Sequence, residues 1–536
     1  MPLPDAFTPW PPKASLAIGD QYDVWSAWYG GDPGALQRAY GADGQLASWG
    51  QNRAARSFFL PDNPRLRNFI ARWFWGSPVP VGEQRSKLHI PVAADIAAIS
   101  ADLLYAEPPT LSLPDGNTAS AEQVEAYVED GLWTSMREAA EQGAAMGGVY
   151  LRVVWDDQVR DRPWLVAAPP DLVVPEWRWD QLAAATFWRV IDSDDPRHVV
   201  RHLERHEPGV ILHGVYVGTK DDLGQRAPLT EFDETRDLAG SLTDGDMIAT
   251  DVPMLTAGYI PNMRPNRIWR GVPSAANLGR SDYSGVEGLF DALDETWSSW
   301  LRDVRLAKAR LVVPQQSLLS LGKGKGATWS TEQEILTGLD IGPNPAQQKP
   351  EMVQFAIRME EHRATASELL EQAVRDAGYS MQTLSGTGDV AMTATEVASR
   401  ERRSLLTRGR KLQYHGPVLR DMLEALLAVD QAKFGPDGVQ PSTPHVDWPK
   451  WVFVDPMDTA STIQILRDAQ VVSLETSLRM LHPDWDDDQI QQERARIVTD
   501  QAGSVDLGGG MGLPVPASDT TSQDQTALDG TDQQGE

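Results

Sequence analysis

The spacing of hydrophobic side chains changes twice along this 536-residue chain, and those changes limit its fold more than any other feature. From Ser120 to about Met146, and again beyond residue 284, hydrophobic residues recur three and four positions apart, as on one face of a helix. Between residues 148 and 260 they alternate with a period of two, and Glu207-Pro208-Gly209 marks a hairpin between two such runs. The pattern predicts an α+β protein that is predominantly helical, with a β-rich module between helical regions.

Three long helices are predicted after the β-rich module. The first covers residues 284–310, and at about 1.5 Å per residue it spans roughly 40 Å. The second runs from about Glu351 to Ala377 and stops at Gly378. The third runs from residue 393 to about 434, and its internal Pro417 predicts a kink. Capping boxes are predicted at Ser120 with Gln123, Ser284 with Glu287, and Thr393 with Glu396.

Polar segments separate and flank these helices. Residues 313–350 are rich in Gly and Pro and predict a small excursion with short strands, whereas residues 379–392 predict a polar loop with no basic residue. A short strand at KWVFVDP and three helices at 458–470, 473–481 and 487–499 are expected to complete the ordered chain. Residues 501–536 carry six acidic and no basic residues, so we expect them to be disordered.

The composition excludes several classes of protein. The chain has no cysteine, which rules out disulfides, cysteine-ligated zinc, iron–sulfur clusters and thiol catalysis. Its net charge of −28 argues against tight binding to nucleic acid, because affinity for DNA depends on basic groups that neutralise phosphates. The N-terminus lacks the pattern of an export signal, and no stretch reaches the roughly 18 apolar residues of a membrane span. We therefore expect neither export nor insertion into a membrane.

Two motifs suggest ligand chemistry but favour simpler explanations. The run GKGKG at residues 322–326 lacks the spacing of a phosphate-binding loop, so we expect a mobile loop there. Histidines and aspartate runs are candidate metal ligands, but solvated or interface histidines and solvated loop carboxylates are favoured. These residues are His198, His202, His206 and His213, and the aspartates at 156–157, 192, 194–195 and 486–488.

The densest basic stretch lies early in the third long helix. It comprises Arg400, Arg402, Arg403, Arg408, Arg410 and Lys411. Contacts with acidic residues of a neighbouring subunit and a solvated helix with intrahelical pairs both remain open, with DNA contact as a third alternative. Trp297 and Trp300 are expected to pack in the core or at a subunit interface.

Five segments, taken in order, resemble the portal proteins of tailed bacteriophages, in particular those of long-tailed actinobacteriophages. They are ADLLYAEPPTL, GGVYLRVVWDD, SDYSGVEGLFDALDETWSSWLRDVRLAKARLVVP, MTATEVASRERRS and VSLETSLRMLHPDWDDDQIQQERARI. The resemblance covers about residues 20 to 500. It implies the phage portal fold, with wing, stem, clip and crown parts, assembled as a ring for which twelve copies is the family's number.

The resemblance also implies a role for each segment. Two stem helices line or support a DNA channel, the clip docks terminase and later the head-completion adaptor, and the tunnel loop faces DNA. The implied parts are an N-terminal arm (1–60), the wing (61–280), stem helix 1 (281–312), the clip (313–350), stem helix 2 (351–378), the tunnel loop (379–392), the kinked helix with the return to the wing (393–456), the crown (457–500) and a disordered acidic tail (501–536).

Candidate site residues follow from those parts. The tunnel-loop candidates are Ser380, Gln382, Thr383, Ser385, Thr387 and Asp389, the clip-docking candidates are Lys323, Lys325 and Trp329, and the subunit-contact candidates are Arg400, Arg402, Arg403 and Arg408. We expect no catalytic residue, metal or cofactor. The implied partners are further copies of the chain, terminase, the adaptor, major capsid and scaffolding proteins, and double-stranded DNA that passes without sequence specificity. The implied location is the portal vertex of the virion, after assembly in the host cytoplasm.

Two other hypotheses stay open from the sequence. One is a metal-dependent hydrolase or nuclease that uses the acidic clusters, including Asp156 and Asp192. The other is a different minor protein of the phage head, for which residues 313–350 would contact neither terminase nor an adaptor.

Overall fold

The computed structural model describes most of the chain. The described residues are 3–40, 74–75, 87–114, 117–195, 197–240, 242, 246–307, 310–312, 319–320, 327–328, 351–353, 357–385, 394–449, 456–482, 485 and 487–506. They fall into two units, one of Met1–Met392 with Glu396–Val452 and one of Thr393–Thr395 with Phe453–Glu536. About half of the described residues are helical, so the α+β class is confirmed with a smaller helical share than predicted.

A six-stranded antiparallel sheet forms the β-rich module that the alternating pattern predicted. Its strand order is β4-β5-β6-β7-β8, and β9 also pairs with β7. The predicted hairpin is confirmed, because Glu207 pairs with Val210 across the turn between β6 and β7. The strands are β4 (Val173–Arg178), β5 (Gln181–Asp195), β6 (His198–Glu207), β7 (Val210–Thr219), β8 (Asp222–Ala227) and β9 (Met247–Ala249).

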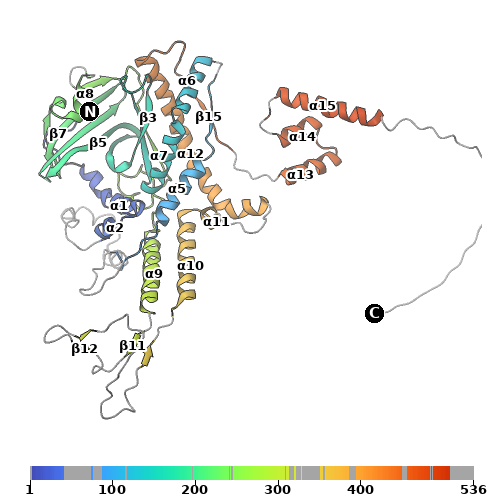
Figure 1. Cartoon of the computed structure of the whole chain (residues 1–536). Helices are drawn as coiled ribbons and strands as arrows, with labels where there is room; N and C mark the ends of the chain where they lie inside the picture. Colours follow the sequence, from blue (N-terminus) through green and yellow to red (C-terminus); the bar gives the residue numbers. More distant parts are fainter. Residues whose placement is uncertain are drawn as a thin grey trace, which may run out of the picture. The chain divides into compact units, whose positions relative to one another are not determined.

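Helices and a smaller three-stranded sheet pack beside this module (Figure 1). The smaller sheet has the order β10-β2-β3. Its strands and the neighbouring elements are α1 (Lys13–Gly30), α2 (Pro33–Tyr40), α5 (Val92–Tyr105), β1 (Thr110–Ser112), α6 (Thr118–Glu129), α7 (Leu132–Met146), β2 (Gly148–Val154), β3 (Trp164–Ala168), α8 (Asp233–Ala239) and β10 (Ala257–Pro261). The arm prediction of one or two short helices underestimated α1, whose Trp25 and Trp28 are fully buried in the core.

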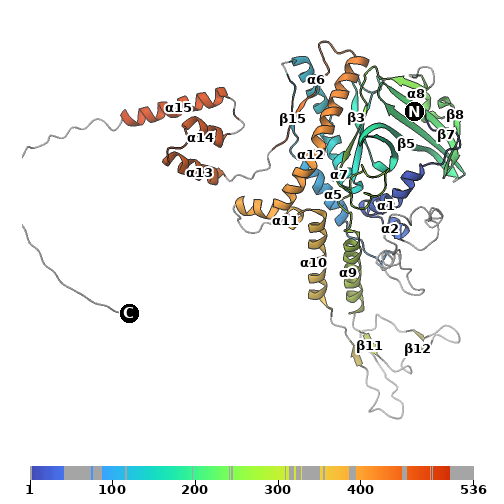
Figure 2. The same cartoon turned by 180° about the vertical axis from the view of Figure 1, so that it is seen from behind.

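Helices α9 (Glu287–Leu306) and α10 (Met359–Ala377) lie side by side and extend away from the sheets, as both views show (Figures 1 and 2). Helix α10 begins eight residues later than predicted, because Glu351–Val353 forms strand β14 and pairs with β11 (Arg310–Val312). A second short pair joins β12 (Leu319–Ser320) to β13 (Ala327–Thr328). The chain therefore leaves and re-enters the helix pair through two adjacent antiparallel strands.

Helix α12 (Ala394–Lys433) follows the short helix α11 (Met381–Ser385) and runs through the first unit. Its second half is buried along Leu419, Leu423 and Leu426, which pack among residues of α5, α7 and the smaller sheet. Pro417 lies inside this helix, and the kink stays a prediction. Strand β15 (His445–Asp447) then pairs with β1. The predicted strand at 450–456 lies almost wholly outside the described residues.

Two predicted capping boxes are wrong. Asn117, rather than Ser120, caps α6 by accepting a hydrogen bond from the Ser120 amide, while the Ser120 hydroxyl donates to the Gln440 carbonyl. At α9 no side chain caps the first turn, and Glu287 instead accepts hydrogen bonds from Trp25 and Gln21. In both places a tertiary contact uses the polar group that the local pattern assigned to the cap.

The second unit contains the three helices predicted near the C-terminus. They are α13 (Pro456–Asp468), α14 (Leu474–Leu481) and α15 (Asp487–Asp506). Leu478 and Ile490 are its buried hydrophobic side chains, and Arg479 joins α14 to α15 through Asp487 at 2.7 Å. Helix α15 continues to Asp506, so the boundary predicted for the disordered tail falls inside a helix.

Candidate functional site at the base of the paired helices

Helices α9 and α10 are joined along their length by different contacts. Near the sheets, Phe290 and Leu293 of α9 pack in one core with Ala373 and Val374 of α10. Further out the contact is polar, because Asp303 accepts hydrogen bonds from Arg358 at 3.0 Å and lies 3.0 Å from His362 Nε2.

An aromatic stack supports this outer contact. Trp300 stacks on Trp297 with ring centres 5.0 Å apart and on His362 at 6.2 Å. His362 and Arg358 also hold the pKa of Asp303 below its usual range. The two tryptophans therefore serve the pairing of α9 with α10, in agreement with the packing role predicted for them.

The return of the chain from α10 is fixed by a glycine turn. Gly378 has a φ of 105°, and the amides of Gly378 and Tyr379 bond to the carbonyls of Arg375 and Val374 in the pattern of a Schellman motif. Thr407 of α12 donates to the Gly378 carbonyl at 2.6 Å. The predicted end of the helix at Gly378 is confirmed, and the hydrogen bond from Thr407 joins this turn to α12.

A buried ionic cluster lies next to that turn, and we call it the junction cluster: Lys411, Asp282, Tyr379, Ser100 and Asn262. The Lys411 ammonium group lies 2.6 Å from Asp282 Oδ2 and 2.6 Å from the Ser100 hydroxyl. The Tyr379 hydroxyl donates to Asp282 at 2.7 Å, and the Asn262 amide donates to the other carboxylate oxygen at 2.8 Å. The cluster ties together α5, β10, the segment before α9, the end of α10 and α12.

The electrostatics of the junction cluster suit a structural role. The Lys411 side chain is 1% exposed and that of Asp282 is 0% exposed. Burial lowers the pKa of Lys411, and Asp282 opposes that effect by favouring the charged ammonium. Burial, followed by Asp282, raises the pKa of Tyr379 well above its usual value, so the phenol stays a hydrogen-bond donor. Apart from a bond from the Asn262 amide to the Arg280 carbonyl at 3.0 Å, the side-chain hydrogen bonds of the cluster join its own members, so its lysine and tyrosine are already bonded to other groups.

One face of α9 carries acidic residues that bind the N-terminal segments. Asp294 accepts hydrogen bonds from the Ile90 amide at 2.9 Å and the Trp75 indole at 3.2 Å, and it lies 2.8 Å from His89 Nδ1. Glu287, two helical turns before Asp294, accepts a hydrogen bond from the Trp25 indole at 2.9 Å. The hydrophobic pattern predicted only the apolar face of this helix. The spacing of Glu287, Asp291 and Asp294 was the signal in the sequence for the second, acidic face.

Replacing Asp291 by asparagine should stabilise the protein at pH 8 and have little effect near pH 4. Asp291 is 5% exposed, one of its carboxylate oxygens has no hydrogen-bond partner, and burial raises its pKa to about 7. The folded state therefore keeps a proton that the unfolded state has lost, so stability falls as pH rises from about 4 to 7. We expect a gain of about 2 kcal/mol in the free energy of unfolding at pH 8, well inside the limit set by the pKa shift.

Urea unfolding at pH 4.5 and pH 8 measures that effect. Asp421→Asn, at an exposed position of α12, is the matched control and should change little at either pH. A loss of stability at pH 8 in Asp291→Asn contradicts the burial of an uncompensated carboxylate.

The predicted tunnel-loop residues begin in ordered structure. Residues 381–385 form α11 rather than a loop, so that part of the loop prediction is wrong. Ser380 and Thr383 are held by Ser404 of α12, whose hydroxyl oxygen lies 2.9 Å from the Ser380 amide and 2.9 Å from the Thr383 hydroxyl. Gln382 is partly buried on α11, and Ser385 ends this helix. Thr387 and Asp389 lie outside the described residues.

The basic stretch of α12 divides into exposed and buried members. Arg402 and Arg403 are exposed, whereas the side chain of Arg400 lies outside the description. Arg408 is buried and donates to the Leu103 carbonyl at 2.6 Å and the Pro449 carbonyl at 3.1 Å. Its predicted role in subunit contact is therefore corrected to an intrachain one, because its guanidinium caps the end of α5. Lys411 is likewise buried rather than solvated.

The clip-docking candidates Lys323, Lys325 and Trp329 lie outside the described residues, as does the run GKGKG. Among the described residues, no group of three or more His, Asp or Glu side chains is arranged to hold a metal ion. His198 is exposed, and the other predicted histidines lie inside the large sheet.

Those buried histidines form part of a polar core rather than the solvated set that we expected. His202 Nε2 lies 3.2 Å from His213 Nδ1, and burial lowers their pKa values to about 3 and 4. His206 contacts Glu204 at 2.8 Å, and Arg152 pairs with the same carboxylate. Burial would raise the pKa of Glu204, but His206 and Arg152 outweigh it and lower the pKa. His206 also lies 2.7 Å from the Thr256 hydroxyl through Nδ1, so this polar core joins the large sheet to β2 and to the segment before β10.

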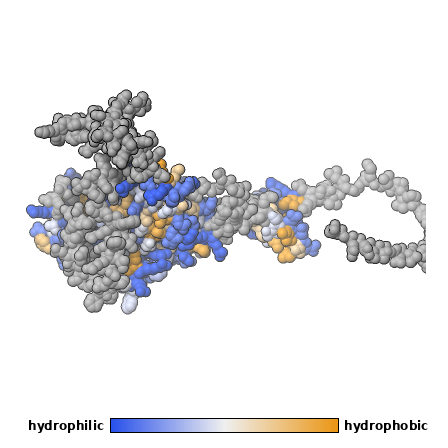
Figure 3. Space-filling model, turned by 90° about the horizontal axis from the view of Figure 1, so that it is seen from below, coloured by the Kyte–Doolittle hydropathy of each residue, from blue (hydrophilic) through white to orange (hydrophobic). Residues whose placement is uncertain are grey.

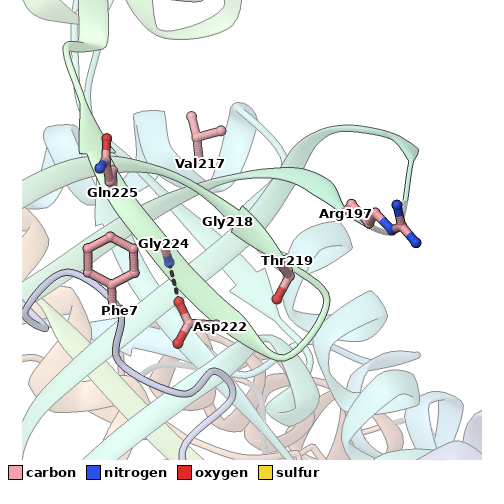
Figure 4. Close-up of a pocket in the computed structure, with 8 residues that line it drawn as sticks. All are labelled: Phe7, Arg197, Val217, Gly218, Thr219, Asp222, Gly224 and Gln225. Atoms are coloured by element: carbon pink, nitrogen blue, oxygen red, sulfur yellow. Dashed lines mark hydrogen bonds between the residues drawn. The ribbon is translucent and has the colours of Figure 1, made fainter.

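A surface pocket lies at the β7–β8 hairpin, and none of its lining residues belongs to the junction cluster (Figure 4). Phe7, Thr219, Asp222 and Gln225 are among its lining residues, and Asp222 already accepts a hydrogen bond from the Gly224 amide at 2.7 Å. The lining holds no nucleophile paired with a base. The pocket gives no support to the hydrolase hypothesis.

The surface of the described residues is mixed in polarity. Hydrophilic and hydrophobic residues are interspersed over the coloured part of the face in Figure 3. No helix in the described ranges is both long enough and apolar enough to cross a membrane.

Comparison with protein families decides what this arrangement belongs to. Residues 78–503, well over half of the chain, match the family described as phage portal protein, SPP1 Gp6-like. The chain belongs to that portal family. A search of curated proteins gave no match. The matched range contains the paired helices, both sheets, α12 and most of the second unit.

Family membership resolves the two alternatives that the sequence left open. Portal proteins are structural components of the phage virion, so this portal protein is not an enzyme, and the hydrolase hypothesis is dropped. Membership also implies a homo-oligomeric ring, which gives the junction cluster a mechanical setting. The predicted portal function is confirmed at the level of the family.

Proposed function

We propose that this portal protein forms the channel at one capsid vertex through which DNA is packaged and ejected, with α9 and α10 as the stem and residues 313–350 as the clip. The observation that carries this assignment is the geometry of the helix pair. Arg310–Val312 and Glu351–Val353 pair as antiparallel strands beyond the outer ends of α9 and α10. Residues 313–350 are therefore presented at the end of the helix pair, where a docking module can reach other proteins.

The remaining parts follow the chain from that assignment. The sheets and the helices around them are the wing, residues 379–392 face the DNA as the tunnel loop, and α13 to α15 belong to the crown. The ring contains twelve copies, and terminase and then the head-completion adaptor dock on the clip through Lys323, Lys325 and Trp329. Capsid and scaffolding proteins contact the ring, and the chain falls in the actinobacteriophage subgroup that its segments resemble. The acidic total supports DNA that slides through the channel without being gripped.

Replacing residues 313–350 by Asn-Gly should leave ring assembly intact and abolish DNA packaging. Val312 pairs with Glu351, so a two-residue turn can close the β11–β14 pair as a hairpin without moving α9 or α10. Electron microscopy of the purified protein should show rings with a central channel for both the natural chain and this variant. Binding to terminase, measured with purified proteins, should be lost in the variant alone.

The combined variant Lys323→Ala, Lys325→Ala and Trp329→Ala is the matched control for the docking residues. It retains the length of the clip and should weaken terminase binding by about tenfold or more, since each lost contact at an interface centre costs about 1–2 kcal/mol. A strictly monomeric natural chain contradicts the ring. Full terminase binding by the Asn-Gly variant contradicts the assignment of the clip.

A further inference from the structure

Trp179 is the most exposed large hydrophobic side chain in the described part of the chain, at 92%. It forms, with Asp180, the two-residue turn between β4 and β5, across which Arg178 pairs with Gln181. Both turn residues have positive φ values, 49° and 62°, a backbone region that bulky side chains rarely occupy. The turn thus holds an indole in water on a strained backbone, and neither feature stabilises the isolated subunit.

Hydrogen bonds fix this turn to a rigid support. Asp180 accepts a hydrogen bond from the Asn277 amide group at 3.0 Å, and Asn277 accepts one from Arg264 at 2.5 Å. The Arg264 carbonyl in turn accepts from the Tyr414 hydroxyl of α12 at 3.3 Å. The turn that carries Trp179 is therefore fixed before any partner arrives, which reduces the backbone entropy lost on binding.

Basic side chains surround this support, and together with Trp179 they form what we call the Trp179 surface: Arg178, Trp179, Arg267, Arg280 and Arg410. Arg178, Arg267 and Arg410 are exposed, and none of them makes an ion pair with a described residue. Arg267 follows Arg264 by three residues, and Arg410 precedes Tyr414 by one turn of α12, so both flank the support. Burial, and then the charge of Arg267, lowers the pKa of the Arg280 guanidinium, and Asp282 opposes this effect. Trp and Arg are the residue types that most often dominate binding energy at protein interfaces.

The positive charge of the Trp179 surface indicates which kind of partner binds it. A basic surface on a chain of net charge −28 is complementary to the surface that another copy presents. Asp20 and Asp23 lie one turn apart on α1, which contacts the short turn that contains Asp171, so the three carboxylates form one acidic group there, with Lys220 as a nearby cation. Asp171 precedes β4 and Trp179 follows it, so the acidic and basic groups lie toward opposite ends of that strand. An acidic surface and a basic surface at separate positions on one subunit suit head-to-tail contacts, because the acidic surface of one copy can bind the basic surface of the next.

We propose that the Trp179 surface binds the acidic surface of a second copy of this chain in the ring. The inference rests on the ring assembly of the proposed function and adds the residues that make the contact. A duplex offers no unstacked base for the indole, so the geometry favours a protein partner over DNA.

Trp179→Ala tests the proposal, with Phe7→Ala as the matched control because Phe7 is also exposed, at 62%, on the β8 edge. We expect Trp179→Ala to raise the protein concentration needed for half-maximal ring formation by about tenfold or more, read by light scattering and electron microscopy. Arg267→Glu with Arg410→Glu should act in the same direction. Phe7→Ala should assemble like the natural chain, and circular dichroism should show all variants folded.

A crosslinking experiment identifies the protein segment that binds the Trp179 surface. The chain has no cysteine, so Trp179→Cys offers a single thiol for a photoreactive label. Because this variant also lacks the indole, its rings are assembled at the higher concentration expected for Trp179→Ala, and crosslinks from them should join residue 179 to an acidic segment of another copy. Rings of Trp179→Ala that form at the natural concentration overturn the proposal while the ring itself stands. If those rings also fail to enter capsids, the surface binds a capsid or scaffolding protein instead. A natural chain that forms no rings refutes the ring and this contact together.

Discussion

Lys411→Met should lower the free energy of unfolding by about 3–5 kcal/mol, the usual effect of removing one partner from a buried ion pair. The substitution preserves most of the side-chain volume but leaves the Asp282 carboxylate, which is fully buried, with hydrogen bonds from Tyr379 and Asn262 alone. Ser100 loses its contact at 2.6 Å as well. Because the cluster joins five segments, we expect a lower melting temperature and a lower yield of rings, measured by calorimetry and electron microscopy.

Two controls separate charge from packing. Lys411→Met combined with Asp282→Asn removes both charges and should recover more than half of the lost stability, since an uncompensated carboxylate no longer remains. Arg402→Met changes an exposed basic residue of the same helix and should shift stability by less than about 0.5 kcal/mol. A single variant as stable as the natural chain, or a double variant no better than the single one, contradicts the proposed role of the ion pair.

The two ends of the α9–α10 pair are held by different kinds of contact. At the end far from the sheets, the contacts in the described residues are the partly exposed Asp303–Arg358 pair, His362 on the same carboxylate and an aromatic stack, whereas the base is held by buried charge and by Thr407 on the Gly378 turn. Exposed ion pairs contribute little stability, and buried networks are costly to break. We therefore expect the helix pair to yield at its outer end before its base.

Hydrophobic spacing was enough to predict most of the elements. The alternating runs between residues 148 and 260 became strands, and the hairpin at residues 207–210 was placed correctly because the turn residues and the apolar runs agree. The helices at 287–306, 359–377 and 394–433 also match, since their apolar faces are long and regular. Hydrophobic spacing predicts a helix or strand correctly where the buried residues of that element recur with the same period over several turns or residue pairs.

Predictions failed where a polar side chain has a distant partner. Glu287 has the spacing of a capping box, yet its hydrogen bonds go to α1, 262 and 266 residues away along the chain. Lys411 and Arg408 belong to a basic stretch for which the sequence left subunit contacts and a solvated helix open, but they are buried against α5 and Asp282. Residues 351–353 continue a helical pattern and form a strand because β11 lies beside them. None of these partners is visible in a local window of sequence.

Insertion of three lysines between Thr387 and Gly388 should reduce DNA packaging by about a hundredfold or more while rings still assemble. The insertion lies beyond Ser380 and Thr383, whose bonds to Ser404 anchor the start of the proposed tunnel loop, so α10 and α12 need not move. Residues 379–392 contain no basic residue, and a ring repeats every added charge in each subunit. Lysines facing DNA replace counterions on the phosphates, which turns a surface that slides into one that grips.

Insertion of Ser-Gly-Ser at the same position is the control for loop length, and it should package within about threefold of the natural portal if charge rather than size is decisive. Packaging is measured as DNA protected from nuclease inside capsids, with rings counted by electron microscopy. Because attraction to phosphates weakens with salt, the lysine variant should recover part of its activity as the salt concentration rises, and the Ser-Gly-Ser variant should not. Unchanged packaging by the lysine variant would mean that residues 379–392 lie away from the DNA, and the constriction would then have to be sought elsewhere along the channel.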